Sequence, residues 1–208
     1  MVDQAQVGPQ SAASIGVNTI TNLRSGQLGD LIVQDLHGRY YENTYRGNMF
    51  SVAAQAVLTT TTGLATTYTG LCVSNPVGSP VNLAVNKCTM MQSVVQSVQV
   101  EAYGLAVGFN LTTNVTHSTS ATPQSNLAGS GLQSNAKADT SAGLPTAPLY
   151  YAFVTNTGTA TADSVAVSMI DLEGSLILKP GAYVLWVTPG QASVAGLWFS
   201  ISWEEVPV

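Results

Sequence analysis

Charged residues are scarce in this chain. Only 8% of its 208 residues are Asp, Glu, Lys or Arg, against about 25% in an average soluble domain. The six basic residues and the net charge of −5 exclude the basic stripe that a nucleic-acid-binding surface needs. Uncharged Thr, Ser, Asn, Gln and Gly replace the missing charges, and they cost less to desolvate than charged groups. The composition therefore favours a protein whose surface becomes covered in an assembly.

Long apolar runs are also missing. The stretch 47–100 carries a single charge, Lys87, but Thr, Ser, Asn, Gly and Pro interrupt it throughout. No segment offers the roughly 20 apolar residues that span a bilayer. The opening "MVDQAQVGPQSAAS" has no basic region followed by an apolar one, so it does not resemble a secretory signal. We expect that the protein is made in the cytoplasm and that it does not associate with a membrane.

Cysteine is nearly absent, with only Cys72 and Cys88. Cytoplasmic synthesis favours two buried, reduced thiols over a disulfide. Two thiols without a nearby histidine also make a poor metal site. We therefore expect no metal and no cofactor.

Groups for catalysis are few. The common hydrolase, metalloprotease, phosphate-binding and dinucleotide-binding motifs are missing. Asp35 and His37 would share a strand face, but no nucleophile completes a triad, and His117 lies in a Ser/Thr-rich stretch. Asp171 and Glu173 would lie about 7 Å apart on one strand face, a separation compatible with a glycosidase pair. However, "DLEGS" is also typical of a turn, so we expect no enzyme and keep a carbohydrate-cleaving enzyme as an alternative.

The N-terminal region differs from the rest of the chain. Residues 1–37 predict an extended arm, because they are rich in Gln, Ser, Asn and Gly and follow no sustained period. Charges concentrate from residue 30 to residue 46, where they sum to −1, which argues against aromatic stacking on nucleobases. The residues in this region that we consider interface candidates are Arg39, Tyr40, Tyr41, Tyr45 and Arg46.

Residues 38–208 predict a single all-β domain. Short alternating or β-branched runs at 49–58, 65–75, 81–91, 103–111, 149–156, 163–174, 175–190 and 196–208 are separated by turn signals. Their spacing is typical of a sandwich or barrel. In "YGLAVGFNL", large residues from Tyr103 to Leu111 would face a core, and the small residues between them would let a neighbouring sheet or subunit pack closely. "LILKPGAYVLWV" has the strand–turn–strand pattern found near the end of many jelly rolls.

The segment 112–148 is rich in Ser, Thr, Asn, Gly and Ala, and it contains no Phe, Trp or Tyr. It predicts a long exposed loop, because loops of this length are usually functional or flexible. The loop would be the recognition element of the chain if the protein binds a receptor.

The closing segment "GLWFSISWEEVPV" predicts a strand with two different faces. Leu197, Phe199, Ile201 and Trp203 would point into the sandwich. Trp198 would point to the other side, where it is our candidate anchor between subunits. The alternative is that the chain's own arm or loop covers Trp198.

Three stretches carry a resemblance to a known group of proteins. "GRYYENTYRGNMFSV" (38–52), "TYTGLCVSNPVGSPVNLAVNK" (67–87) and "WEEVPV" (203–208) together resemble virion structural proteins of tailed bacteriophages. The resemblance implies a non-enzymatic jelly-roll β-sandwich that forms a homotrimer on the capsid as a decoration or cement protein. Its partners would be other copies of itself and the major capsid protein or other virion proteins. The alternative is a tail or fibre component with a receptor-binding role.

Overall fold

The computed structural model describes residues 38–56, 58, 60, 63–92, 100–157, 167–189 and 196–208. The expected arm, residues 1–37, lies outside the described residues, and so do Asp35 and His37. The described elements are α1 (Tyr41–Tyr45), β1 (Met49–Ala53), β2 (Thr67–Ser74), β3 (Val81–Gln92), β4 (Val100–Phe109), β5 (Thr116–Ala121), β6 (Gln124–Ser125), β7 (Lys137–Gly143), β8 (Leu149–Thr157), β9 (Val167–Leu178), β10 (Ala182–Val187) and β11 (Leu197–Pro207).

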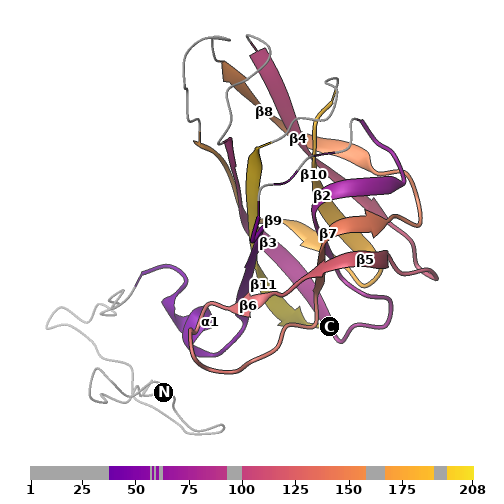
Figure 1. Cartoon of the computed structure of the whole chain (residues 1–208). Coiled ribbons are helices and arrows are strands. Elements are labelled where there is room, and N and C mark those ends of the chain that lie inside the picture. Colours follow the sequence, from indigo (N-terminus) through magenta and orange to yellow (C-terminus); the bar gives the residue numbers. More distant parts are fainter. Residues whose placement is uncertain are drawn as a thin grey trace, which may run out of the picture. The chain divides into compact units, whose positions relative to one another are not determined.

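The strands form two antiparallel sheets, which face each other as a sandwich (Figure 1). One sheet has the order β6-β1-β11-β3-β9, and the other has the order β5-β7-β2-β10-β4-β8. Strands β5, β6 and β7 all lie between β4 and β8 in the chain. Among the other eight strands, β1 pairs with β11, β2 with β10, β3 with β9 and β4 with β8. In chain order, the first of these eight therefore pairs with the last, the second with the seventh, the third with the sixth and the fourth with the fifth. The predicted all-β sandwich is confirmed.

The core between the sheets follows the alternation of the sequence. In β11, Leu197, Phe199, Ile201 and Trp203 are buried in it, as predicted. The ring of Trp186 from β10 stacks on the ring of Phe199, with centroids 5.5 Å apart, and so joins the two sheets. Burying such large side chains supplies most of the stabilising free energy of a sandwich.

A second apolar cluster covers the outer face of the six-stranded sheet. Strand β10 alternates between the two cores, because Val184 and Trp186 face inward while Tyr183 and Leu185 face outward. Loop residues also contribute to this outer cluster, including Leu144. The other buried residues of this outer cluster are Tyr68, Cys72, Ala106, Val115, Ala142 and Val187. The middle strands of this sheet are therefore buried on both faces by their own chain.

The small residues of β4 are covered within the chain. A Cβ atom on Gly108 would meet the Tyr183 ring and hydroxyl as close as 2.3 Å, and one on Gly104 would touch the Phe153 ring. The small residues do permit close packing, but against adjacent strands of the same sheet rather than against a neighbouring sheet or subunit. Here the close neighbours are aromatic side chains of the same chain.

The segment 112–148 is not one long loop, because it contains β5, β6 and β7. β7 pairs with β2 on one side and with β5 on the other, so it widens the six-stranded sheet. The buried residues of β7 are Ala138, Asp139 and Ala142, so its only buried apolar side chains are methyl groups. Alanine and threonine give a weak hydrophobic alternation, which explains why the sequence pattern suggested a loop.

One further sequence prediction is corrected. The turn expected within "DLEGS" is a bulge inside the continuous strand β9, where Glu173 and Gly174 have φ values of 48° and 83°. Asp171 and Glu173 are both exposed. The tyrosines near residue 41 lie in or beside a short helix, α1, that the strand-dominated pattern did not indicate.

Candidate interaction surface

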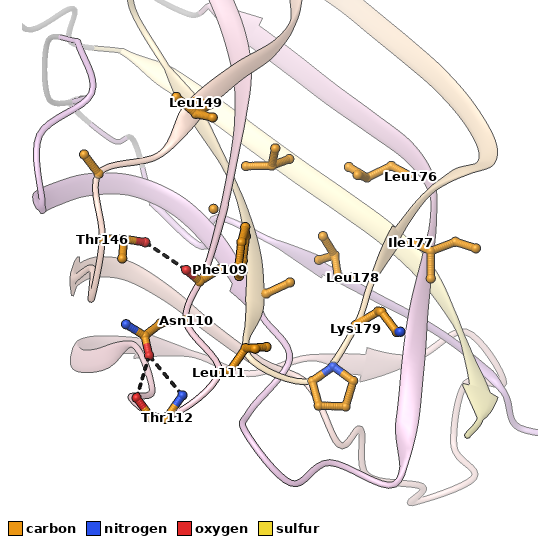
Figure 2. Close-up of a pocket in the computed structure, with 15 residues that line it drawn as sticks. Phe109, Asn110, Leu111, Thr112, Thr146, Leu149, Leu176, Ile177, Leu178 and Lys179 are labelled. Carbon is orange, nitrogen blue, oxygen red and sulfur yellow. Dashed lines mark hydrogen bonds between the residues drawn. The ribbon is translucent and has the colours of Figure 1, made fainter.

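An apolar groove of about 820 Å³ lies at one end of the sandwich (Figure 2). Its walls come from the end of β4, the segment before β8, the end of β9 and the start of β10. The apolar side chains that define it are Phe109, Leu111, Leu149, Leu176, Ile177 and Leu178. Its size falls within the range of known ligand and peptide sites, roughly 300–1,000 Å³. We call it the β8–β9 groove.

The groove exists because the sandwich is open at this edge. β8 ends the six-stranded sheet and β9 ends the five-stranded sheet, so the two strands are not joined by a ladder in the described residues. Phe109 is 66% exposed and Leu149 is 71% exposed. The sequence predicted a core position for Phe109 and for Leu111, but both lie where the facing sheet no longer covers them. Exposed apolar residues gathered in this way typically mark a binding surface.

Hydrogen bonds fix the walls of the groove. The Thr146 hydroxyl donates to the carbonyl oxygen of Phe109 at 3.1 Å, and the Tyr183 hydroxyl donates to the carbonyl oxygen of Thr146 at 2.6 Å. The Asn75 amide donates to the carbonyl oxygen of Leu178 at 3.0 Å. Because these hydrogen bonds hold the backbone of the walls in place, a ligand would lose less conformational entropy of the groove on binding.

The turn between β9 and β10 closes the lower end of the groove. Gly181 has a φ of 90°, and a Cβ atom there would come within 2.3 Å of the carbonyl oxygen of Asn110. The sequence identified Pro180 and Gly181 as a turn, and this prediction is confirmed. Next to the turn, Lys179 is the one charged residue among the described residues that line the groove. The groove therefore suits an apolar segment with an acidic neighbour.

A polar pair lies elsewhere, on the added strands of the six-stranded sheet. Nδ1 of His117 is 2.6 Å from Oδ2 of Asp139, and the Asp139 side chain is fully buried. The Ser120 hydroxyl donates to the other carboxylate oxygen at 3.4 Å. Burial raises the pKa of the Asp139 carboxyl, while the bonds from His117 and Ser120 oppose that rise. The arrangement holds β5 against β7.

Sequence reasoning did not find this pair. His117 and Asp139 are 22 positions apart, and nothing in the local pattern indicates that β5 and β7 are neighbours. Within the described ranges, no group of three or more His, Cys, Asp or Glu side chains could hold a metal ion.

The predicted interface candidates have different surroundings. Trp198 is partly buried on the outer face of the five-stranded sheet, beside Met91 of β3. Tyr41 and Tyr45 are 44% and 49% exposed. The Arg39 guanidinium lies 5.6 Å from the centre of the Tyr40 ring, a cation–π contact. Arg46, at the end of the same segment, is exposed.

The two cysteines are buried and free, as expected. Cys88 belongs to the core between the sheets, and Cys72 belongs to the outer cluster. Burial raises the pKa of the Cys88 thiol to about 12 and raises that of Cys72 still further. We therefore expect both thiols to be unreactive in the native state.

Comparison with known proteins leaves the family open. Neither a protein-family model, nor a curated protein, nor a solved structure matches this chain. In the part of the chain that the structure describes, no helix has the length and apolar character needed to cross a membrane.

Proposed function

We propose that the chain is a structural protein of a bacteriophage virion, and that it binds the capsid surface as a trimeric decoration or cement protein. The observation that carries the proposal is the pairing of eight strands as first with last, second with seventh, third with sixth and fourth with fifth. We infer from this pairing that the sandwich is a jelly roll, the fold that the sequence resemblance implies.

The composition supports the same proposal. Composition is independent evidence here, because a fold alone does not define a function. The chain has few charges, and several of its exposed apolar residues, among them Phe109, Leu149 and Ile177, line one groove of the sandwich. Such a surface can be desolvated at low cost when many copies cover a shell. Weak contacts repeated over many copies become collectively strong.

The proposed mechanism is mechanical. Each trimer would bury surface across the boundaries between capsid subunits, with the major capsid protein as the partner. Pressure from packaged genome would then have to break these added contacts before the shell could open. The function requires no catalytic group and no cofactor.

Binding to capsids tests the proposal directly. Purified protein should bind expanded heads, and particles that lack it should lose their genome at a lower temperature and a lower chelator concentration than complete particles. The mass of the purified protein in solution should correspond to three chains. Failure to bind heads, or equal stability of the two kinds of particle, would refute the cement role.

Trp198 provides a test of the trimer contact. Trp198→Ala should weaken the trimer more than it lowers the stability of the monomer, because buried aromatic anchors often contribute more than about 2 kcal/mol to an interface. Phe199→Ala is the matched control, because Phe199 belongs to the core and its loss should mainly lower the melting temperature. A Trp198→Ala variant that stays trimeric and only melts earlier would show that Trp198 acts within its own chain.

A tail or fibre component with a receptor-binding role is the second candidate. It is favoured by β5, whose polar residues from Thr116 to Ser120 are exposed at the edge of the six-stranded sheet. Immunogold labelling of particles separates the two candidates. A label over the whole head supports the decoration role, and a label at the tail tip supports the alternative.

A further inference from the structure

We propose that the β8–β9 groove binds residues 30–36 of a neighbouring copy of this chain as an added strand. The inference rests on the proposed self-association, and it assigns a site and an occupant to that association.

The groove has the two properties that strand addition needs. It lies between two edge strands, β8 and β9, which pair on one side only in the described sheets. It is also lined by apolar side chains, including Phe109, Leu149 and Ile177, which stay exposed without a partner. An incoming extended segment would gain backbone hydrogen bonds from an edge and bury alternate side chains in the groove.

The chain contains a segment of matching chemistry. Residues 30–36 read "DLIVQDL", and residues 31–33 form the longest uninterrupted aliphatic run in the first 37 residues. Ile32 and Val33 are β-branched, which favours an extended backbone. In an extended segment, Leu31 and Val33 project from one face and are separated by roughly 7 Å. They would fill the groove together.

The charges are complementary as well. Asp30 and Asp35 flank the aliphatic run, and Lys179 is the one charged residue among those lining the groove. Among the described residues that line the groove, none is acidic, so none repels them. An ion pair at the rim adds little affinity, but it favours one register of the strand over others.

Mixing two single variants tests whether one copy supplies the strand to another. Leu31→Cys chains are mixed with Ile177→Cys chains at full length, allowed to exchange subunits, and oxidised. We expect a disulfide-linked pair of chains on a non-reducing gel, because the native Cys72 and Cys88 are buried and do not compete. Thr119→Cys, at an exposed position on β5, replaces Ile177→Cys in the matched control and should give only background linkage.

A charge placed in the groove gives an independent readout. Leu149→Asp changes a side chain that is 71% exposed, so the fold should tolerate it, yet it would face the acidic flanks of the bound segment. We expect at least about tenfold weaker self-association, measured by sedimentation, and loss of the disulfide-linked pair. Thr119→Asp is the control and should change neither.

The outcomes separate this inference from the proposed function. Trimers that bind heads but give no linkage above the Thr119→Cys control would overturn the groove assignment alone. The same holds if the double variant Leu31→Cys, Ile177→Cys links only within one chain. If the protein is monomeric in solution and does not bind heads, both proposals are wrong.

Discussion

Glu205 should be a main determinant of stability, although it lies near the exposed end of β11. Its side chain is 6% exposed, and its two carboxylate oxygens accept hydrogen bonds from the segment between β6 and β7. The Ser134 hydroxyl donates at 2.5 Å, the Asn135 backbone amide at 2.8 Å and the Asn135 side-chain amide at 2.7 Å. This segment passes from one sheet to the other, so the carboxylate of Glu205 ties the two sheets together.

The size of the effect follows from these bonds. Hydrogen bonds to a charged group contribute about 1.5–3 kcal/mol each, which gives an upper limit of about 9 kcal/mol for three. In Glu205→Ala the donors of Ser134 and Asn135 can bind water, because Ser134 is partly exposed and Asn135 is exposed. We therefore expect a loss of about 3 kcal/mol, which corresponds to a decrease of about 6–12 °C in melting temperature.

A graded series of variants makes the test specific. Glu205→Gln keeps an acceptor, and its amide can pair with a rotated Asn135 side chain, so it should lose only about 1 kcal/mol. Glu204→Gln is the matched control on the opposite face of the strand and should stay within about 0.5 kcal/mol of the wild type. Chemical denaturation monitored by tryptophan fluorescence gives each value. If Glu205→Ala and Glu204→Gln had equal stability, the anchoring role would be wrong.

Three further predictions concern buried groups. Cys72 and Cys88 should stay unmodified by a thiol reagent in the native protein and react fully in denaturant, because burial raises both pKa values; rapid native labelling would contradict this. Burial raises the pKa of Asp139, so its stabilising contribution is complete below about pH 4 and is lost as the pH rises through the native pKa. Between about pH 4 and the native pKa of Asp139, the wild type should lose stability relative to Asp139→Asn, as measured by denaturation at each pH. If the free energies of unfolding of the two proteins changed in parallel with pH, the raised pKa of Asp139 would be refuted. Gly108→Ala should destabilise by about 2 kcal/mol or more, because the new methyl group meets the Tyr183 ring; an unchanged melting temperature would show that the ring moves freely.

The sequence predicted those parts of the fold in which large apolar residues alternate with polar ones. β11 is an example, because Phe199 and Trp203 mark its buried face without ambiguity. β7 was missed because its buried apolar residues are the alanines Ala138 and Ala142, and a methyl group gives little periodic signal. The continuity of β9 was missed because Gly174 is as typical of a turn as of a bulge, and only the pairing with β3 decides between them.

The candidate sites were less predictable than the fold. Phe109 alternates correctly in the sequence, but whether a facing sheet covers it depends on where the opposite strands end. The contact between His117 and Asp139 depends on the pairing of two added strands, which no local pattern encodes. The exposure of Phe109 and the contact between His117 and Asp139 therefore both depend on segments that are distant in the sequence.

The second apolar cluster restricts where any partner can bind. The middle strands of the six-stranded sheet are covered on both faces, and Tyr183 and Leu185 of β10 are completely inaccessible. The outer face of the five-stranded sheet is different, because its side chains, such as Ser202 and Asp171, are partly or fully accessible. A surface scan for binding defects can therefore begin with this one broad face and the strand edges. The two outer sides of the sandwich therefore differ. If an assembly binds the protein through one side, the orientation of the other side is fixed as well.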